Sequence, residues 1–170
     1  MAAANRGAMP KSRRWFCLAA AVMLLDYVSK IAVLVSFAPG ESRVLTPFFN
    51  LVLVFNRGAA FSFLAAAQGW QTLLFAAIAL VASVVISFLI YKYADKTLFC
   101  FGLALILGGA LGNLLDRVVY GHVIDFLDFH ALGWHWPAFN VADSAITVGA
   151  ATLILESFLQ RDEGRRENKG

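Results

Sequence analysis

The stretch WQTLLFAAIALVASVVISFLIY, residues 70–91, carries no charged side chain. A helix of about 20 apolar residues is long enough to cross the roughly 30 Å hydrocarbon core of a bilayer. Comparable runs occupy residues 15–37, 98–115 and 141–159. The sequence therefore predicts a mainly α integral membrane protein, organised as a single membrane domain over 1–170 with four transmembrane helices.

The composition agrees with a membrane protein. The chain is 60% hydrophobic and 15% charged, whereas a soluble domain is roughly 25% charged. The net charge is +3, but basic and aromatic residues do not interleave on a polar face, so nucleic acid is not an expected partner. Cys17 and Cys100 lie in apolar runs without metal-ligand spacing, and we expect both to be buried small hydrophobic residues.

The distribution of basic residues predicts the orientation. Ten of the 14 Lys and Arg residues lie before the first run, between the second and third, or after the fourth. By the positive-inside rule, both termini and the turn at 92–97 are cytoplasmic, and the outer segments 39–69 and 116–140 are extracytoplasmic. The segment before the first run is read as part of a retained anchor, and the charged tail 161–170 is expected to be disordered.

The two outer segments differ in pattern. Between residues 43 and 63, apolar residues are interrupted by Pro47, Asn50, Asn56 and Gly58, which predicts short strands and a small β element. Residues 121–136 mix aromatic side chains with two aspartates and three histidines, a mixture typical of an interfacial helix or loop.

Polar residues inside the apolar runs require an explanation, because an unpaired ion in a bilayer costs at least about 2.5 kcal/mol. Asp26 and Lys30 are four residues apart and share a helical face. They form either a structural ion pair facing the bundle or part of a functional site. Gly108 and Gly112 have small-xxx-small spacing, which favours close helix packing.

Further polar residues gather near the outer ends of the runs. Asn113 and Arg117 project together toward the outer interface, where Arg117 either reaches lipid headgroups or acts on nearby carboxylates. Asn140 and Asp143 fit an N-cap and a first-turn acid of the fourth helix. Asp125 taken alone is one solvated loop charge. None of these residues by itself indicates an enzyme.

Five blocks together resemble the lipoprotein signal peptidases, also called the signal peptidase II or prolipoprotein signal peptidase family. The blocks are DYVSK at 26–30, FNRGAAF at 55–61, GGALGNLLDR at 108–117, GHVIDF at 121–126 and FNVAD at 139–143. They occur in the expected order, with the expected four spans and chain length.

The resemblance implies an aspartic endopeptidase of the bacterial cytoplasmic (inner) membrane. Such an enzyme is a multi-pass protein with its active site at the extracytoplasmic face. Its partners would be membrane lipid and a prolipoprotein signal peptide, cleaved immediately before the diacylglyceryl-modified cysteine. The family's catalytic pair maps onto Asp125 and Asp143. Its supporting positions map onto Asp26, Lys30, Asn56, Gly58, Asn113, Arg117 and Asn140.

The implied chemistry is physically coherent. Two carboxyl groups held close together do not both ionise readily, so one keeps a proton while the other is a carboxylate. The carboxylate deprotonates a water that attacks the scissile carbonyl, and the protonated partner donates to its oxygen. This chemistry requires no metal and no cofactor, and we expect a monomer. The sequence leaves open which aspartate holds the proton.

Other functions fit the pattern of residues less well. His122, His130 and His135 share an outer segment but lack a His-Glu-x-x-His pattern, which disfavours a metalloprotease. Ser29, Ser62 and Ser144 lack an accompanying base, which disfavours a serine mechanism. Because Asp26 and Lys30 lie inside a span, a small transporter or proton-conducting protein is the main alternative, and a noncatalytic scaffold is a third.

Overall fold

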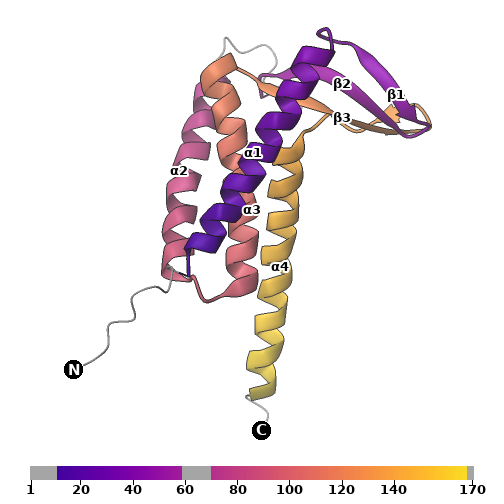
Figure 1. Ribbon diagram of the computed structural model, residues 1–170. Coiled ribbons are helices and arrows are strands. Elements are labelled where there is room, and N and C mark those ends of the chain that lie inside the picture. Colours follow the sequence, from indigo (N-terminus) through magenta and orange to yellow (C-terminus); the bar gives the residue numbers. More distant parts are fainter. Residues whose placement is uncertain (1–10, 59–69, 168–170) are drawn as a thin grey trace.

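The computed structural model describes residues 11–58 and 70–167 and consists of a helical bundle with a small sheet at one end (Figure 1). The helices are α1 (Arg13–Ser36), α2 (Trp70–Lys92), α3 (Thr97–Tyr120) and α4 (Val141–Glu167). All four are long and apolar enough to cross a membrane. Helix α3 packs against the other three and is the most buried of them. The predicted fold class is confirmed.

The sheet is antiparallel and lies beyond the ends of α1 and α3. Its strands are β1 (Ser42–Thr46), β2 (Phe49–Asn56), β3 (Val123–Ala131) and β4 (Trp134–His135), in the spatial order β1-β2-β3-β4. The predicted β element in the first outer segment is therefore confirmed for β1 and β2. The part of that segment at 59–69, with Phe61, Ser62 and Phe63, lies outside the described residues.

The second outer segment differs from its prediction, because much of it forms strands and not an interfacial helix or loop. Strand β3 pairs with β2 along most of its length. The pairing satisfies the backbone groups of the β2 edge, which an isolated two-stranded hairpin would leave open. The partner strand comes from about 70 residues further along the chain, so local pattern alone did not predict it.

Two helices extend beyond their predicted ends. Helix α3 continues past residue 115 to Tyr120, because its last polar residues find partners inside the protein, and Gly121 ends it with a left-handed φ of 74°. Helix α4 continues to Glu167, so the predicted disordered tail is wrong for 161–167. Arg, Glu and Gln are good helix formers once a helix has begun. Residues 168–170 lie outside the described part of the chain.

Glycines on α3 let its neighbours approach closely. A Cβ at Gly108 would lie 2.6 Å from the backbone carbonyl oxygen of Ala19 in α1. A Cβ at Gly109 would overlap the carbonyl oxygen of Ala142 in α4. The predicted packing role of these small residues is confirmed.

The first half of α3 forms the apolar part of the core. Its buried residues pack with α1 and α2 in one cluster: Trp15, Ala19, Ile86, Ile90, Cys100, Leu103, Ala104 and Leu107. Cys100 is buried as predicted, whereas the prediction for Cys17 is wrong, because that residue is exposed on the outside of the bundle.

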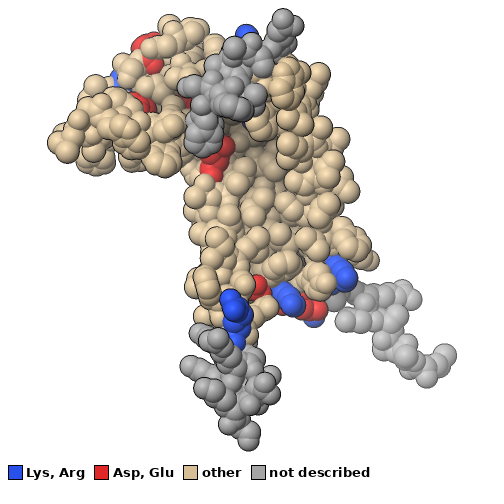
Figure 2. Space-filling model, turned by 180° about the vertical axis from the view of Figure 1, so that it is seen from behind, with Lys and Arg blue, Asp and Glu red and all other residues tan. Residues whose placement is uncertain are grey.

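Charged residues are concentrated at the two ends of the molecule. Seen from behind, Lys and Arg gather at the end of the bundle opposite the sheet, and a broad uncharged belt separates the two ends (Figure 2). The helix ends Arg13, Lys92 and Thr97 lie at that basic end, as does the later part of α4. A belt of this kind suits a bilayer that surrounds the bundle.

Candidate active site

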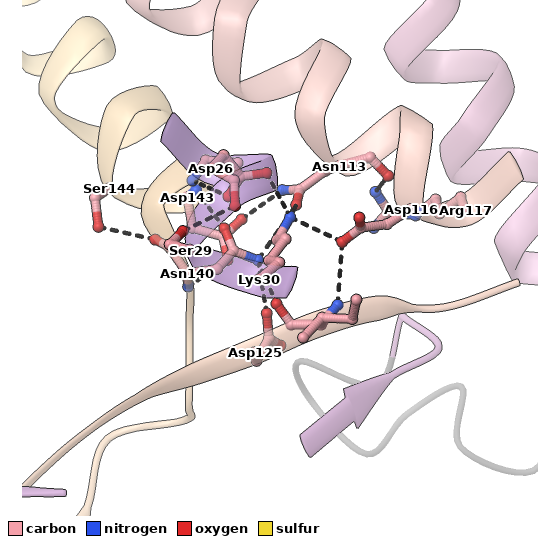
Figure 3. Close-up of polar contacts among 12 residues, drawn as sticks. Asp26, Ser29, Lys30, Asn113, Asp116, Arg117, Asp125, Asn140, Asp143 and Ser144 are labelled. Carbon is pink, nitrogen blue, oxygen red and sulfur yellow. Dashed lines mark hydrogen bonds and ion pairs between the residues drawn. The ribbon is translucent and has the colours of Figure 1, made fainter. Parts of the chain in front are cut away.

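Polar side chains from four separate elements meet where the bundle joins the sheet (Figure 3). Asp26 and Lys30 come from α1, Asn113 and Asp116 from the last turns of α3, Asp125 from β3, and Asn140 and Asp143 from the start of α4. We refer to these seven residues as the polar cluster. They are connected by hydrogen bonds and ion pairs, so the residues predicted separately from the sequence lie in one network.

Asn140 is the link between Asp125 and Asp143. Its side chain is fully buried, and its Nδ2 donates to Asp125 Oδ1 at 2.7 Å. Its Oδ1 accepts from the backbone N–H of Asp143 at 2.9 Å, and its own backbone N–H donates to Asp143 Oδ2 at 3.3 Å. This reciprocal arrangement is a capping box with Asp in place of Glu. The predicted N-cap is confirmed, and besides Asp143 the capping residue also contacts the carboxyl group of Asp125.

Asp125 lies on β3 and is 1% exposed. Besides Asn140, it accepts a hydrogen bond from Asn56 Nδ2 to its Oδ2 at 2.9 Å. Burial raises the pKa of Asp125 to about 6, and the nearby charge of Asp143 adds to this, while the amide donors of Asn56 and Asn140 oppose it. Asp125 is therefore not the solvated loop charge of the simplest interpretation.

Asp143 is half-buried in the first turn of α4. Its Oδ1 accepts from Asn113 Nδ2 at 2.7 Å, and its Oδ2 accepts from the backbone of Asn140. Asp125 and Asp143 each accept two of these hydrogen bonds, but Asp125 is enclosed and Asp143 is more open.

Lys30 occupies the centre of the buried network. Its Nζ lies 2.7 Å from Asp26 Oδ2, 2.8 Å from Asp116 Oδ2 and 3.0 Å from Asn113 Oδ1. An ammonium group has three N–H donors, so each donor has one acceptor. The predicted ion pair between Asp26 and Lys30 is confirmed, and it belongs to the polar cluster and not to a separate structural pair.

Asp26 also satisfies the start of α4. Its Oδ1 accepts from the backbone N–H of Ala142 at 2.9 Å, one of the amides that a helix N-terminus leaves without an intrahelical partner. The close approach depends on Gly112, because a Cβ there would lie 2.5 Å from Asp26 Oδ2. The buried carboxylate of Asp26 therefore joins α1 to the start of α4.

Asp116 belongs to the network but was absent from the residues predicted for the site. Besides its ion pair with Lys30, its Oδ2 accepts from the backbone N–H of Ile124 at 3.2 Å. Ile124 directly precedes Asp125 on β3, so Asp116 holds the strand that carries that carboxyl group. Its spacing of three residues from Asn113, on the same helix face, was the available signal.

The other predicted positions lie at the edge of the polar cluster. Asn56 Oδ1 accepts from the N–H of Gly58 at 2.8 Å, an Asx turn that orients the Asn56 amide toward Asp125. Gly58 has a φ of 105°, and a Cβ there would lie 2.6 Å from the Phe75 ring. Arg117 donates to the carbonyl of Asn113 and lies 5.4 Å from the centroid of the same ring. Its charge interacts with Asp143, Asp116 and Asp125.

The histidines lie elsewhere on the sheet and its connections. His135 Nδ1 is 2.9 Å from Asp128 Oδ1, and the same carboxylate accepts from Asn50. Burial raises the pKa of Asp128, but these contacts together outweigh it, and the pKa is lowered overall. His130 stacks on His135, and the ring of His122 lies against that of Phe55 at an interplanar angle of 46°. Within 11–58 and 70–167, no three His, Cys, Asp or Glu side chains are grouped as metal ligands.

Comparison of the sequence with models of protein families shows to which family the chain belongs. The family model of signal peptidase (SPase) II matches residues 18–159. The chain belongs to the signal peptidase II family. It is therefore a peptidase, as predicted, and the family assignment favours an enzyme over the transporter and scaffold alternatives.

Individual relatives agree with the assignment. The chain is 57% identical over 152 residues to the lipoprotein signal peptidase of Paraburkholderia phymatum (strain DSM 17167 / CIP 108236 / LMG 21445 / STM815), covering 89% of this chain and 91% of the relative. It is 59% identical over 142 residues to that of Ralstonia nicotianae (strain ATCC BAA-1114 / GMI1000), covering 84% and 82%.

Two solved structures share the fold. Both are described as a bacterial membrane enzyme structure by the in meso method, one at 2.3 Å and one at 1.9 Å resolution. The first has a TM-score of 0.78 and 28% identity, covering 88% of this chain and 90% of the other. The second has a TM-score of 0.74 and 30% identity, covering 84% and 91%. The signal peptidase II chain described here is accordingly a multi-pass membrane protein.

Proposed function

We propose that this peptidase removes signal peptides from bacterial prolipoproteins, cutting immediately before a diacylglyceryl-modified cysteine, with Asp125 and Asp143 as the catalytic pair. The family and the names of the relatives support the substrate class. The observation that supports the pair is the buried Asn140, which contacts both carboxyl groups although they lie on different elements. A single residue that donates to both, through its side-chain amide to Asp125 and its backbone N–H to Asp143, limits how far apart they can lie.

The surroundings of the pair support a division of roles. Asp125, with its raised pKa of about 6, is the partner that keeps a proton. Asp143, at the helix N-terminus with donors from Asn113 and Asn140, is the carboxylate that acts as general base. The pair nevertheless titrates as one coupled unit, and the assignment describes which of the two carboxyl groups holds the shared proton in the active form.

Hydrolysis then follows in two proton-balanced steps. Asp143 takes a proton from water while the water oxygen attacks the scissile carbonyl carbon, and Asp125 donates its proton to the carbonyl oxygen. The tetrahedral intermediate collapses when the proton on Asp143 passes to the leaving nitrogen of the cysteine and the C–N bond breaks. The hydroxyl proton returns to Asp125, so both groups regain their starting states.

In this proposal the polar cluster lies at the extracytoplasmic face of the inner membrane. The basic ends of the helices lie opposite the sheet, and the positive-inside rule puts that basic end, with both termini, in the cytoplasm. The outer end therefore carries the reactive pair. A substrate with an apolar signal helix and a lipid-modified cysteine reaches that end within the bilayer, so one monomer suffices without extraction of the substrate.

Supporting residues hold this arrangement. Asp26, Lys30 and Asn113 brace the start of α4 and the base, whereas Asn56, with its turn at Gly58, holds the acid. Arg117 adds positive charge near Asp116, Asp125 and Asp143. In the proposed role this charge stabilises negative charge in the site and helps to position the substrate backbone.

The test is cleavage of a purified diacylglyceryl-modified prolipoprotein by the full-length protein in detergent. Asp125→Asn and Asp143→Asn should each reduce turnover by about 10³-fold or more, since each removes a proton-transfer group. Asp128→Asn is the matched control, because Asp128 lies on the same strand but contacts Asn50 and His135, and turnover should be retained. Turnover should also be unchanged by a metal chelator. Normal cleavage by either of the first two variants would refute the proposed pair.

A further inference from the structure

The turn between β3 and β4 exposes a hydrophobic residue in an unfavourable conformation. Leu132 and Gly133 connect the paired residues Ala131 and Trp134, which makes a two-residue hairpin turn. The φ of Leu132 is 52°, and among the described residues it is the only non-glycine with positive φ. Its side chain is fully exposed.

Leucine is an unfavourable residue at position 132 if the turn is surrounded by water. Two-residue turns with positive φ at both positions prefer Asn or Gly first, and a leucine in this region is strained. A fully exposed leucine gains nothing from burial to offset that strain. A fully exposed leucine at a position where Asn or Gly is preferred points to surroundings other than water.

The surface behind the turn is aromatic and uncharged. It contains a cavity of about 470 Å³, of a size that takes small ligands or segments of chain. Trp134 and Trp136 are both more than half exposed beside it. Among the residues that the structure describes, no Lys, Arg, Asp or Glu lines it. The aromatic lining consists of Phe48, Phe129, Trp134, Trp136 and Phe139, together with His130.

This surface reaches the segment that leads into a candidate membrane helix. Phe139 lies two residues before α4 begins, and the sheet projects sideways from the bundle at the level where α1 ends and α4 begins (Figure 1). The exposed ion pair between Arg43 and Glu41 lies at β1, the opposite edge of the sheet from β4. The uncharged edge is therefore the one beside the start of a membrane helix.

We propose that the β3–β4 turn is a membrane-insertion element, with Leu132 in the acyl-chain region of the outer leaflet and phospholipid packed in the aromatic surface behind it. Tryptophan is enriched at this depth, because its ring is apolar while its indole N–H reaches polar lipid groups. The insertion fixes the sheet against the bilayer. Because β3 also carries Asp125, lipid contact at one end of the strand steadies the acid at the other.

The test measures the depth of the turn in the full-length protein, reconstituted in nanodiscs of phosphatidylcholine and phosphatidylglycerol. In a background with Cys17→Ala and Cys100→Ala, a nitroxide label is attached at Leu132→Cys and, in a separate protein, at Ser42→Cys. Ser42 is the control because it is exposed at the β1 edge. Collisions with oxygen, which concentrates in lipid, are compared with collisions with a water-soluble nickel complex.

The label at 132 should collide several-fold more with oxygen than with nickel, and the label at 42 should show the reverse. Equal behaviour at the two positions would overturn the proposal, as would shielding of position 132 from both reagents, which indicates a protein contact. A second measurement needs no cysteine change. Brominated lipid should quench a fluorescence component that disappears in the Trp134→Phe/Trp136→Phe variant, whereas quenching of that component by aqueous acrylamide alone would count against insertion.

Discussion

The two halves of α3 are both buried, but they are buried in opposite ways. The first half packs Cys100, Leu103 and Leu107 into an apolar cluster. The second half places Asn113 and Asp116 in a network of ions and amides. Apolar contacts are non-directional and tolerate changes of similar volume. Buried ions require each partner to be present and correctly placed.

The difference shows where the protein accepts an energetic cost. A bundle in lipid is held by close packing, and it needs no buried ions for that purpose. The ion pairs of Lys30 with Asp26 and Asp116 therefore need another explanation, which is the positioning of the elements that they hold in place. The network holds the start of α4 and the beginning of β3, the two elements that carry Asp143 and Asp125.

The largest expected effect separates stability from turnover. Lys30→Met keeps the side-chain length but leaves Asp26 and Asp116 buried without their cation, which should cost about 3–5 kcal/mol of unfolding free energy. Turnover per folded molecule should fall by more than about 100-fold, because both active elements lose a brace. Detergent unfolding and cleavage assays measure the two quantities.

The matched change in the apolar half is Leu103→Ala. It should cost about 2–5 kcal/mol through lost packing and the cavity that remains. Turnover per folded molecule should stay within about twofold of wild type, since none of the polar cluster is touched. Similar losses of turnover in both variants would mean that the halves of α3 do not differ in the way described.

A second prediction concerns Asn140, which caps α4 and bridges the two carboxyl groups. Asn140→Ala should lower kcat by about 100-fold through misplacement of the pair, and loss of the cap should cost about 1 kcal/mol. Asn140→Ser restores a capping oxygen but has no amide to reach Asp125. The serine variant should therefore recover stability and remain impaired in cleavage. Recovery of both would show that the bridge is unimportant.

Asp116 should have a smaller effect. Asp116→Asn keeps an oxygen that can accept from Ile124 N–H, but it weakens the attraction to Lys30. We expect a loss in kcat of roughly tenfold with KM unchanged, because the strand that carries Asp125 shifts slightly. A change confined to KM would argue that Asp116 acts on substrate binding, and an unchanged rate would remove its positioning role.

The smallest effect is a shift in pH dependence. With Asp125 as the protonated partner and a pKa of about 6, its active form is lost as pH rises through that value, so kcat/KM should fall. Asn56 donates to this carboxyl group and lowers its pKa, so Asn56→Ala should move the fall to higher pH. Rate profiles from about pH 5 to about pH 8 measure both. A rate that rises through pH 6 would reverse the roles of the two aspartates.

Much of the molecule followed from the order of its residues. The lengths of the apolar runs determined four helices, because lipid leaves a backbone segment no other way to satisfy its hydrogen bonds. The position of Asn140 and Asp143 at the start of the fourth run determined the cap, which is a local interaction. The resemblance of the five blocks then named the residues of the polar cluster, with the exception of Asp116.

Only the tertiary structure decided how these residues meet. Asp26 accepts from an amide 116 residues away, and Asn50 and Asp128 pair across strands 78 residues apart. Pattern within one element does not reveal such contacts, because they depend on how separately formed elements pack. For the same reason the raised pKa of Asp125 and the strand at 123–131 could not be predicted: both depend on burial and pairing supplied by distant parts of the chain.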